Sequence, residues 1–130
     1  MTEGTGRILI VDDEPSLLKM MSLYLGRLGF QVSTADTTEN AWGQVQAAPA
    51  DFAVAVLDAT MAGMAMEELA ARLLAANSSL CVLAASGYPV DMSALVAANP
   101  GRVAFLHKPF TPEMLAAAVR RMLGPQEEKL

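Results

Sequence analysis

The sequence predicts a single α/β domain built on an open, five-stranded parallel β-sheet with helices on both faces. Short apolar runs alternate five times with segments that carry helical spacing or helix-end signals. Alternation of this kind implies parallel strands joined by right-handed crossovers. The 130 residues suffice for one such domain. A closed eight-stranded barrel would need about 250 residues.

Five apolar runs have the length and composition of β-strands. In chain order they are 7–11, 31–35, 52–57, 80–84 and 103–106. The runs 52–57 and 80–84 are continuously apolar, as expected of central parallel strands covered on both faces. The run 31–35 alternates polar and apolar residues, which indicates a half-buried edge strand. This edge position favours the strand order 2-1-3-4-5 of flavodoxin-like folds.

Five helices are expected between and after these strands. They cover about 15–28, 38–47, 66–76, 91–99 and 112–122. The first helix is expected to start at Pro15, the second at Thr37 or Thr38, the fourth at Asp91, and the fifth at Thr111 followed by Pro112. The third is predicted from its composition, which is rich in Ala, Leu and Glu. Gly29 and Gly124 supply stops for the first and last helices.

Composition excludes several classes of function. The net charge is −5 with no basic cluster, which argues against direct binding of nucleic acid. No apolar run reaches the roughly 18 residues of a membrane span, and no signal peptide is recognisable at the N-terminus. The single cysteine, Cys81, cannot form an internal disulfide, so a cytoplasmic location is expected. One domain over 6–123 is predicted, with flexible ends at 1–5 and 124–130.

Polar residues suited to chemistry follow four of the five predicted strands. Asp12 and Asp13 follow the first strand, Asp58 the third, Ser86 the fourth and Lys108 the fifth. The carboxyl ends of parallel strands meet at one edge of the sheet, where open α/β sheets build their sites. Three converging carboxylates repel one another unless a cation intervenes. Mg²⁺ and the lysine ammonium would supply that charge, an arrangement that suits phosphoryl transfer to a carboxylate.

These residues lie in four motifs that resemble the response-regulator receiver family of bacterial two-component systems, the chemotaxis regulators included. The motifs are Ile10-Val11-Asp12-Asp13-Glu14-Pro15, Leu57-Asp58, Ala85-Ser86-Gly87 and Phe105-Leu106-His107-Lys108-Pro109-Phe110. Each is common alone, but four in order at the ends of predicted strands are specific. The resemblance covers about residues 6–123 and implies the flavodoxin-like receiver fold.

The resemblance implies a phosphoacceptor and a metal site. Asp58 is expected to receive the phosphoryl group. Mg²⁺ is expected to bind Asp13, Asp58 and the backbone carbonyl of Thr60 directly, and Asp12 through water.

Further roles at the same edge are implied for residues after the fourth and fifth strands. Lys108 is expected to pair with a phosphoryl oxygen, and its bond to Pro109 to be cis. Ser86 would donate its hydroxyl to the phosphoryl group, and Phe105 would be the aromatic residue that turns inward in response. Tyr88, two residues after Ser86, is expected to flank the phosphoryl group.

The implied partners are proteins. The donor would be a phosphohistidine on a sensor histidine kinase or a histidine phosphotransfer domain, and the downstream protein is not readable from the sequence. The chain would be either a single-domain regulator or the receiver of a hybrid histidine kinase. Such a receiver catalyses its own phosphorylation and dephosphorylation without being a turnover enzyme. Two alternatives stay open: an aspartyl-nucleophile phosphatase, and a scaffold that no longer accepts phosphate.

The loop after Asp58 departs from the family pattern. The family often has Met-Pro-x-Met-Asp-Gly where this chain has Met61-Ala62-Gly63-Met64-Ala65-Met66. The third helix is therefore expected to lack an Asp cap, a change worth about 1 kcal/mol in comparable cases. Since this loop must also hold the Thr60 carbonyl, the departure bears on metal affinity.

Overall fold

A computed structural model describes residues 6–124 as a five-stranded parallel sheet flanked by five α-helices. The strands are β1 (Arg7–Val11), β2 (Gln31–Ala35), β3 (Phe52–Asp58), β4 (Cys81–Ser86) and β5 (Val103–His107). The helices are α1 (Pro15–Arg27), α2 (Thr38–Ala47), α3 (Met66–Ala76), α4 (Ser93–Ala98) and α5 (Pro112–Leu123), with a short 3₁₀ turn at Pro49–Asp51. The strand order is β2-β1-β3-β4-β5, as the sequence predicts. Of the ends predicted to be flexible, 1–5 and 124–130, all residues except Gly124 lie outside the described residues, and Gly124 forms the C-cap of α5.

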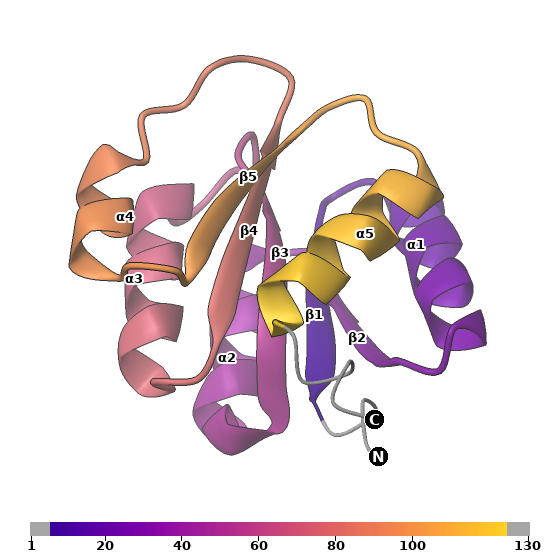
Figure 1. Ribbon diagram of the computed structural model, residues 1–130, viewed down its shortest axis with the longest axis horizontal. Coiled ribbons are helices and arrows are strands. Elements are labelled where there is room, and N and C mark those ends of the chain that lie inside the picture. The colour runs from indigo at the N-terminus through magenta and orange to yellow at the C-terminus, as the bar shows by residue number, and fades with distance from the viewer. Residues whose placement is uncertain (1–5, 125–130) are drawn as a thin grey trace.

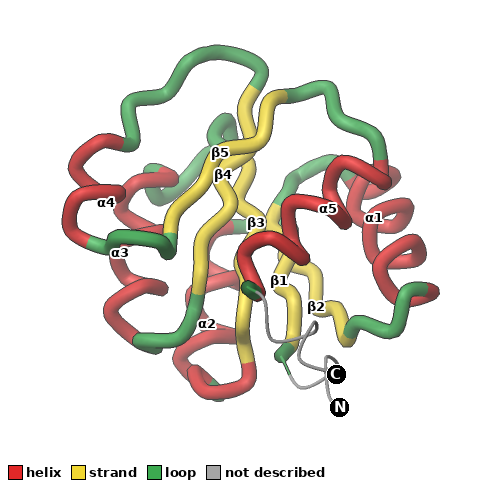
Figure 2. The backbone as a smooth tube through the Cα atoms, viewed as in Figure 1, coloured by secondary structure: helices red, strands yellow, loops and turns green. Residues whose placement is uncertain are grey.

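The helices form one layer on each face of the sheet. Figure 1 shows α1 and α5 on one side and α2, α3 and α4 on the other, and Figure 2 shows the sheet between them. Each layer encloses its own apolar core. On one face the core includes Leu25 of α1 together with Leu115 and Val119 of α5. On the opposite face it includes Leu69 and Leu73 of α3. The continuously apolar β3 contributes alternate residues to both cores, which explains its composition.

Three strands run further toward the functional edge than the sequence indicates. β3 includes Asp58, β4 includes Ser86 and β5 includes His107. The backbone pairing continues to those residues, since Asp58 aligns with Ala85 and Ser86 with His107. The polar side chains at these strand ends are therefore held by the sheet itself rather than by free loops.

The helix starts follow the capping signals with one exception. Thr37 caps α2 by accepting a hydrogen bond from the Asn40 amide, and Thr111 caps α5 in the same way. Asp91, expected to cap α4, lies one residue too early. The N-cap of α4 is Met92, and Asp91 instead accepts hydrogen bonds from the hydroxyl and amide of Ser93, which lower the pKa of Asp91.

The third helix begins without a side-chain cap, as the sequence predicts. Its N-cap is Ala65, which offers no oxygen to the unpaired amides of the first turn. Glu67 and Glu68 in that turn supply negative charge near the helix N-terminus instead. The loop that precedes α3 must therefore be fixed by other contacts.

No helix within residues 6–124 is long and apolar enough to cross a membrane.

Candidate functional site

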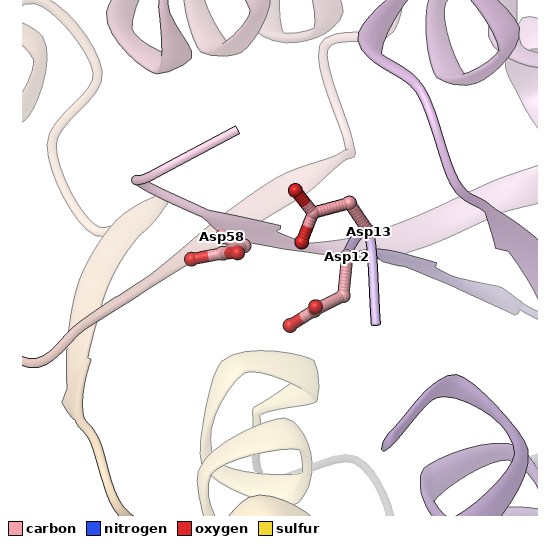
Figure 3. A group of neighbouring side chains, drawn as sticks. All are labelled: Asp12, Asp13 and Asp58. Atoms are coloured by element: carbon pink, nitrogen blue, oxygen red, sulfur yellow. The ribbon is translucent and has the colours of Figure 1, made fainter. Parts of the chain in front are cut away.

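The sheet order places the three acidic residues of the site side by side. β1 and β3 are adjacent strands, and Val11 pairs with Leu57 at their carboxyl ends. Asp12 and Asp13 follow Val11 directly, and Asp58 follows Leu57. Figure 3 shows the three side chains gathered at this edge. The convergence predicted from the sequence is thus present in the fold.

The three carboxylates are close enough to share one cation. One oxygen from each of Asp12, Asp13 and Asp58 lies within 4.8 Å of the others. Asp12 and Asp58 are only 4% and 6% exposed, whereas Asp13 faces solvent. Oxygen ligands and a site open on one side are what Mg²⁺ prefers in proteins. The donor set therefore fits a hard divalent cation.

Lys108 supplies a fixed positive charge to the same cluster. Its Nζ lies 3.2 Å from Asp12 Oδ2 and 3.3 Å from Asp58 Oδ1. Partial burial disfavours the charged ammonium, but its contacts with Asp12 and Asp58 outweigh that cost and raise the pKa of Lys108. The lysine is therefore charged at physiological pH and bridges the two buried acids.

Asp12 is held in an environment that opposes its ionisation. Burial raises the pKa of Asp12, and the nearby Asp58 adds to that effect. The Glu14 amide, which donates to Asp12 Oδ1 over 3.0 Å, and the Lys108 ammonium both act in the opposite direction. Repulsion among the acids is therefore only partly relieved by the protein, which favours binding of an added cation.

Thr60 contacts Asp58 closely. The Thr60 amide donates to Asp58 Oδ1 over 3.2 Å, and the Thr60 hydroxyl lies 3.1 Å from both carboxylate oxygens. Asp58 Oδ1 thus receives the Thr60 amide and the Lys108 ammonium. Among the contacts of the described residues, Oδ2 meets only the Thr60 hydroxyl, so it is the less constrained oxygen.

Ser86 is fully buried, and its hydroxyl is turned into the loop that follows β4. Ser86 Oγ donates to the carbonyl of Tyr88 over 2.8 Å and accepts from the Tyr88 amide over 3.1 Å. The Ser86 carbonyl in turn accepts the Lys108 amide over 2.9 Å. Ser86 therefore links the β4–α4 loop to the start of the β5–α5 loop.

The remaining predicted residues surround this centre. The Lys108–Pro109 bond is cis, as the resemblance implies. Phe105 is half-buried, and its ring meets that of His107 edge-on at 5.1 Å. Tyr88 is 50% exposed and lines a shallow cavity beside Ala59, the residue next to Asp58.

Thr38 is a buried polar residue that the sequence does not distinguish from a helix cap. It is 2% exposed, and its hydroxyl contacts the loop after β3. The only signal in the sequence at this position is a threonine that could cap the second helix, and in the structure the neighbouring Thr37 is that cap.

Fold and site together define a flavodoxin-like α/β domain whose acid-and-lysine site lies at the carboxyl edge of the sheet. The chain belongs to the response regulator receiver domain family, whose sequence pattern it matches over residues 8–120. The family resemblance in the four motifs is thereby confirmed.

Relatives and solved structures agree with this assignment. The chain is 29% identical over 116 residues to the response regulator GtcR of Aneurinibacillus migulanus, covering 89% of this chain and 47% of that protein. It is 28% identical over 123 residues to the DNA-binding response regulator MtrA of Mycolicibacterium smegmatis, covering 95% of this chain and 53% of that protein. The chain therefore spans about half the length of these curated relatives.

Two solved receiver domains show the same fold. A CheY-like receiver domain protein from Methanospirillum hungatei JF-1 superposes with a TM-score of 0.81 at 25% identity, covering 96% of this chain and 98% of that one. The receiver domain of the hybrid histidine kinase CckA superposes with a TM-score of 0.77 at 25% identity, covering 91% and 99%.

Proposed function

We propose that this domain is a phosphoacceptor switch in which Asp58 receives a phosphoryl group from a phosphohistidine in a Mg²⁺-dependent reaction. The observation that carries the proposal is the convergence of Asp12, Asp13, Asp58 and Lys108 at the carboxyl ends of three separate strands. The donor would be a sensor histidine kinase or a histidine phosphotransfer domain acting in the cytoplasm. The phosphorylated form would act on a downstream protein.

The proposed transfer is a displacement at phosphorus. Asp58 Oδ2, the less constrained oxygen, forms the new P–O bond while the P–N bond to the donor imidazole breaks. Lys108 stabilises charge that builds up on the transferring oxygens. Mg²⁺ held by Asp13, Asp58 and the Thr60 carbonyl, with Asp12 acting through water, would neutralise the remaining charge. The protein positions the reacting groups, which is most of what phosphoryl transfer requires.

The proposed switch follows from the present hydrogen bonds of Ser86. Its hydroxyl is occupied by the Tyr88 backbone. A phosphoryl group on Asp58 would compete for that hydroxyl, because hydrogen bonds to a charged acceptor are stronger than those to a carbonyl. Release of Tyr88 would free the β4–α4 loop and let Phe105 turn inward. The population would shift toward an altered α4-β5-α5 face.

Intact mass after incubation with acetyl phosphate tests the proposed function. With Mg²⁺ the chain should gain the mass of one phosphoryl group, and with a chelator it should gain none. Failure to gain mass under both conditions would favour the scaffold. Sustained turnover of phosphate esters by the chain would favour a phosphatase.

Tyr88 is predicted to slow the loss of the phosphoryl group. Tyr88 is exposed and lines the same cavity as Ala59, where its bulk would hinder the attacking water. The lifetime of phosphoryl-Asp58 should shorten severalfold in Tyr88→Ala, measured by intact mass after removal of the donor. Tyr88→Phe keeps the bulk and should keep the lifetime. An unchanged or longer lifetime in Tyr88→Ala contradicts this role.

A further inference from the structure

Thr38 stands out among the buried polar residues of the domain. Within residues 6–124, four polar or charged side chains are buried: Asp12, Thr38, Asp58 and Ser86. Three of them belong to the site at the carboxyl edge of the sheet. Thr38 does not cap α2, since Thr37 accepts the amide of Asn40 over 2.9 Å. Its burial therefore needs another explanation.

The hydroxyl of Thr38 joins α2 to the β3–α3 loop, residues 59–65. Thr38 Oγ1 accepts a hydrogen bond from the Met64 amide over 3.1 Å, between residues that are 26 positions apart. The same hydroxyl donates to Glu39 Oε1 over 3.3 Å. Because the hydroxyl both donates and accepts, it replaces two hydrogen bonds that water would otherwise make.

The β3–α3 loop packs Met61 and Met64 against the apolar core but has few other hydrogen bonds. At its start, the Ala59 amide donates to the Ala85 carbonyl over 2.9 Å, and the Thr60 amide donates to Asp58. At its end, α3 begins at Ala65 without a side-chain cap. Among the hydrogen bonds of the described residues, the next one along this loop after Thr60 is the bond from Met64 to Thr38. That bond therefore supplies the directional contact on the far side of the loop, where apolar packing alone sets no backbone orientation.

Close packing at Gly63 supports the same contact. Gly63 has φ +93°, and a Cβ built there would lie 2.8 Å from Thr38 Oγ1 and 3.1 Å from Glu39 Oε2. Only glycine suits that backbone conformation and that separation. The loop thus runs directly against the start of α2, and Gly63 permits the approach.

We propose that Thr38 is a positioning residue for the metal site, because it holds the β3–α3 loop in the conformation that presents the Thr60 carbonyl. The inference rests on the proposed Mg²⁺ site. Without the hydroxyl, the loop would populate more conformers, and the affinity for metal falls with the fraction that is competent to bind. Thr38 would thereby compensate for a loop that lacks the proline and aspartate common in the family.

Three variants separate positioning from general stability. Thr38→Val removes the hydroxyl but keeps the shape, Thr38→Ser keeps the hydroxyl, and Thr37→Val removes the neighbouring hydroxyl that caps the same helix. The Mg²⁺ dissociation constant is measured by titration calorimetry, together with hydrogen exchange at the Met64 amide and the thermal unfolding midpoint. Thr38→Val should weaken Mg²⁺ binding about fivefold, the scale of one lost hydrogen bond, and should speed exchange at Met64.

The two controls should behave differently from Thr38→Val. Thr38→Ser should bind Mg²⁺ as the wild type does. Thr37→Val should lower the unfolding midpoint while leaving the Mg²⁺ dissociation constant unchanged. Gly63→Ala disturbs the same contact from the loop side, so it should also weaken Mg²⁺ binding, which provides a second route if Thr38→Val does not fold.

Each contrary outcome has a distinct meaning. If the wild type binds Mg²⁺ and Thr38→Val binds it equally well, the positioning role is wrong and the proposed function stands. Equal weakening in Thr37→Val and Thr38→Val would also overturn it, since the effect would then be one of helix stability. If the wild type binds no Mg²⁺ at all, both the metal site and the role of Thr38 are wrong.

Discussion

Replacement of Asp58 by asparagine is expected to abolish the uptake of a phosphoryl group from acetyl phosphate. An amide has no anionic oxygen with which to attack phosphorus, and neither Asp12 nor Asp13 takes its place. Asp12 is buried against Lys108 and the Glu14 amide, and Asp13 lies outside the contacts with Thr60 and Lys108 that orient Asp58. The measurement is the phosphorylated fraction by intact mass at saturating donor and Mg²⁺.

The fold should survive this replacement. Asparagine has the shape of aspartate, and it removes one of three clustered negative charges. The gain from reduced repulsion offsets the loss of the charged contact with Lys108, so the free energy of unfolding should change by no more than about 1 kcal/mol. Asp51→Asn, an exposed acid in the 3₁₀ turn, is the matched control and should still be phosphorylated. A phosphorylated Asp58→Asn protein would place the acceptor elsewhere.

Much of this fold is predictable because the residue pattern of each strand agrees with the place of that strand in the sheet. The apolar runs of β1 and β3 are buried on both faces, and the alternating run of β2 lies at the edge of the sheet. The site is predictable for the same reason. In a parallel sheet the residues that follow adjacent strands must meet, so Asp13 and Asp58 are brought together by topology alone.

The contacts that fix the loops were not predictable, because they join polar groups without any periodic signal. Thr38 bonds to Met64 across 26 positions. Arg102 reads in the sequence as an isolated charge, yet its guanidinium donates to the carbonyls of Leu74, Asn77 and Leu80 and so closes the end of α3. Such bonds depend on the positions of backbone carbonyls in the folded chain, and the spacing of residue types along the sequence does not predict these positions.

The orientation of Ser86 illustrates the same limit at the site itself. Its place at the end of β4 follows from the sequence, but its hydroxyl pairs with the Tyr88 backbone. A hydroxyl rotates freely and takes whichever partner the loop offers. The sequence therefore locates the residue, and only the three-dimensional structure shows the two hydrogen bonds that the proposed switch would have to break.

Replacement of Lys108 by methionine is expected to lower the initial rate of phosphorylation by about 10²–10³, the usual cost of one group that stabilises transition-state charge. The variant should also be less stable in metal-free buffer. Asp12 would lose its ion pair while remaining buried. Removing one partner of a fully buried pair costs about 3–5 kcal/mol. Because Lys108 is partly exposed, a loss of about 2 kcal/mol is expected, measured by urea unfolding.

The pH dependence of the stability lost in Lys108→Met identifies the cause of that loss. Burial already raises the pKa of Asp12, and Lys108 is one of the groups that lower it, so the folded-state pKa rises further in Lys108→Met. When the pKa of a carboxyl is higher in the folded chain than in the unfolded chain, where it is near 3.9, the carboxyl favours folding at pH values below 3.9. This contribution to stability is lost as the pH rises through the folded-state pKa. The stability deficit of the variant should therefore shrink between pH 7 and pH 4. A deficit that is independent of pH would point to lost packing of the lysine stem instead.

Lys108→Arg separates charge from geometry at the same position. Arginine keeps a positive charge near Asp12 and Asp58, so most of the stability should return, and the pH-dependent part of the deficit should disappear with it. Its planar guanidinium cannot occupy the position of a compact ammonium lying 3.2 and 3.3 Å from two different acids. The rate of phosphorylation should therefore stay low. Recovery of both stability and rate would mean that the site needs only a positive charge, whereas recovery of stability alone shows that it needs the ammonium at this position.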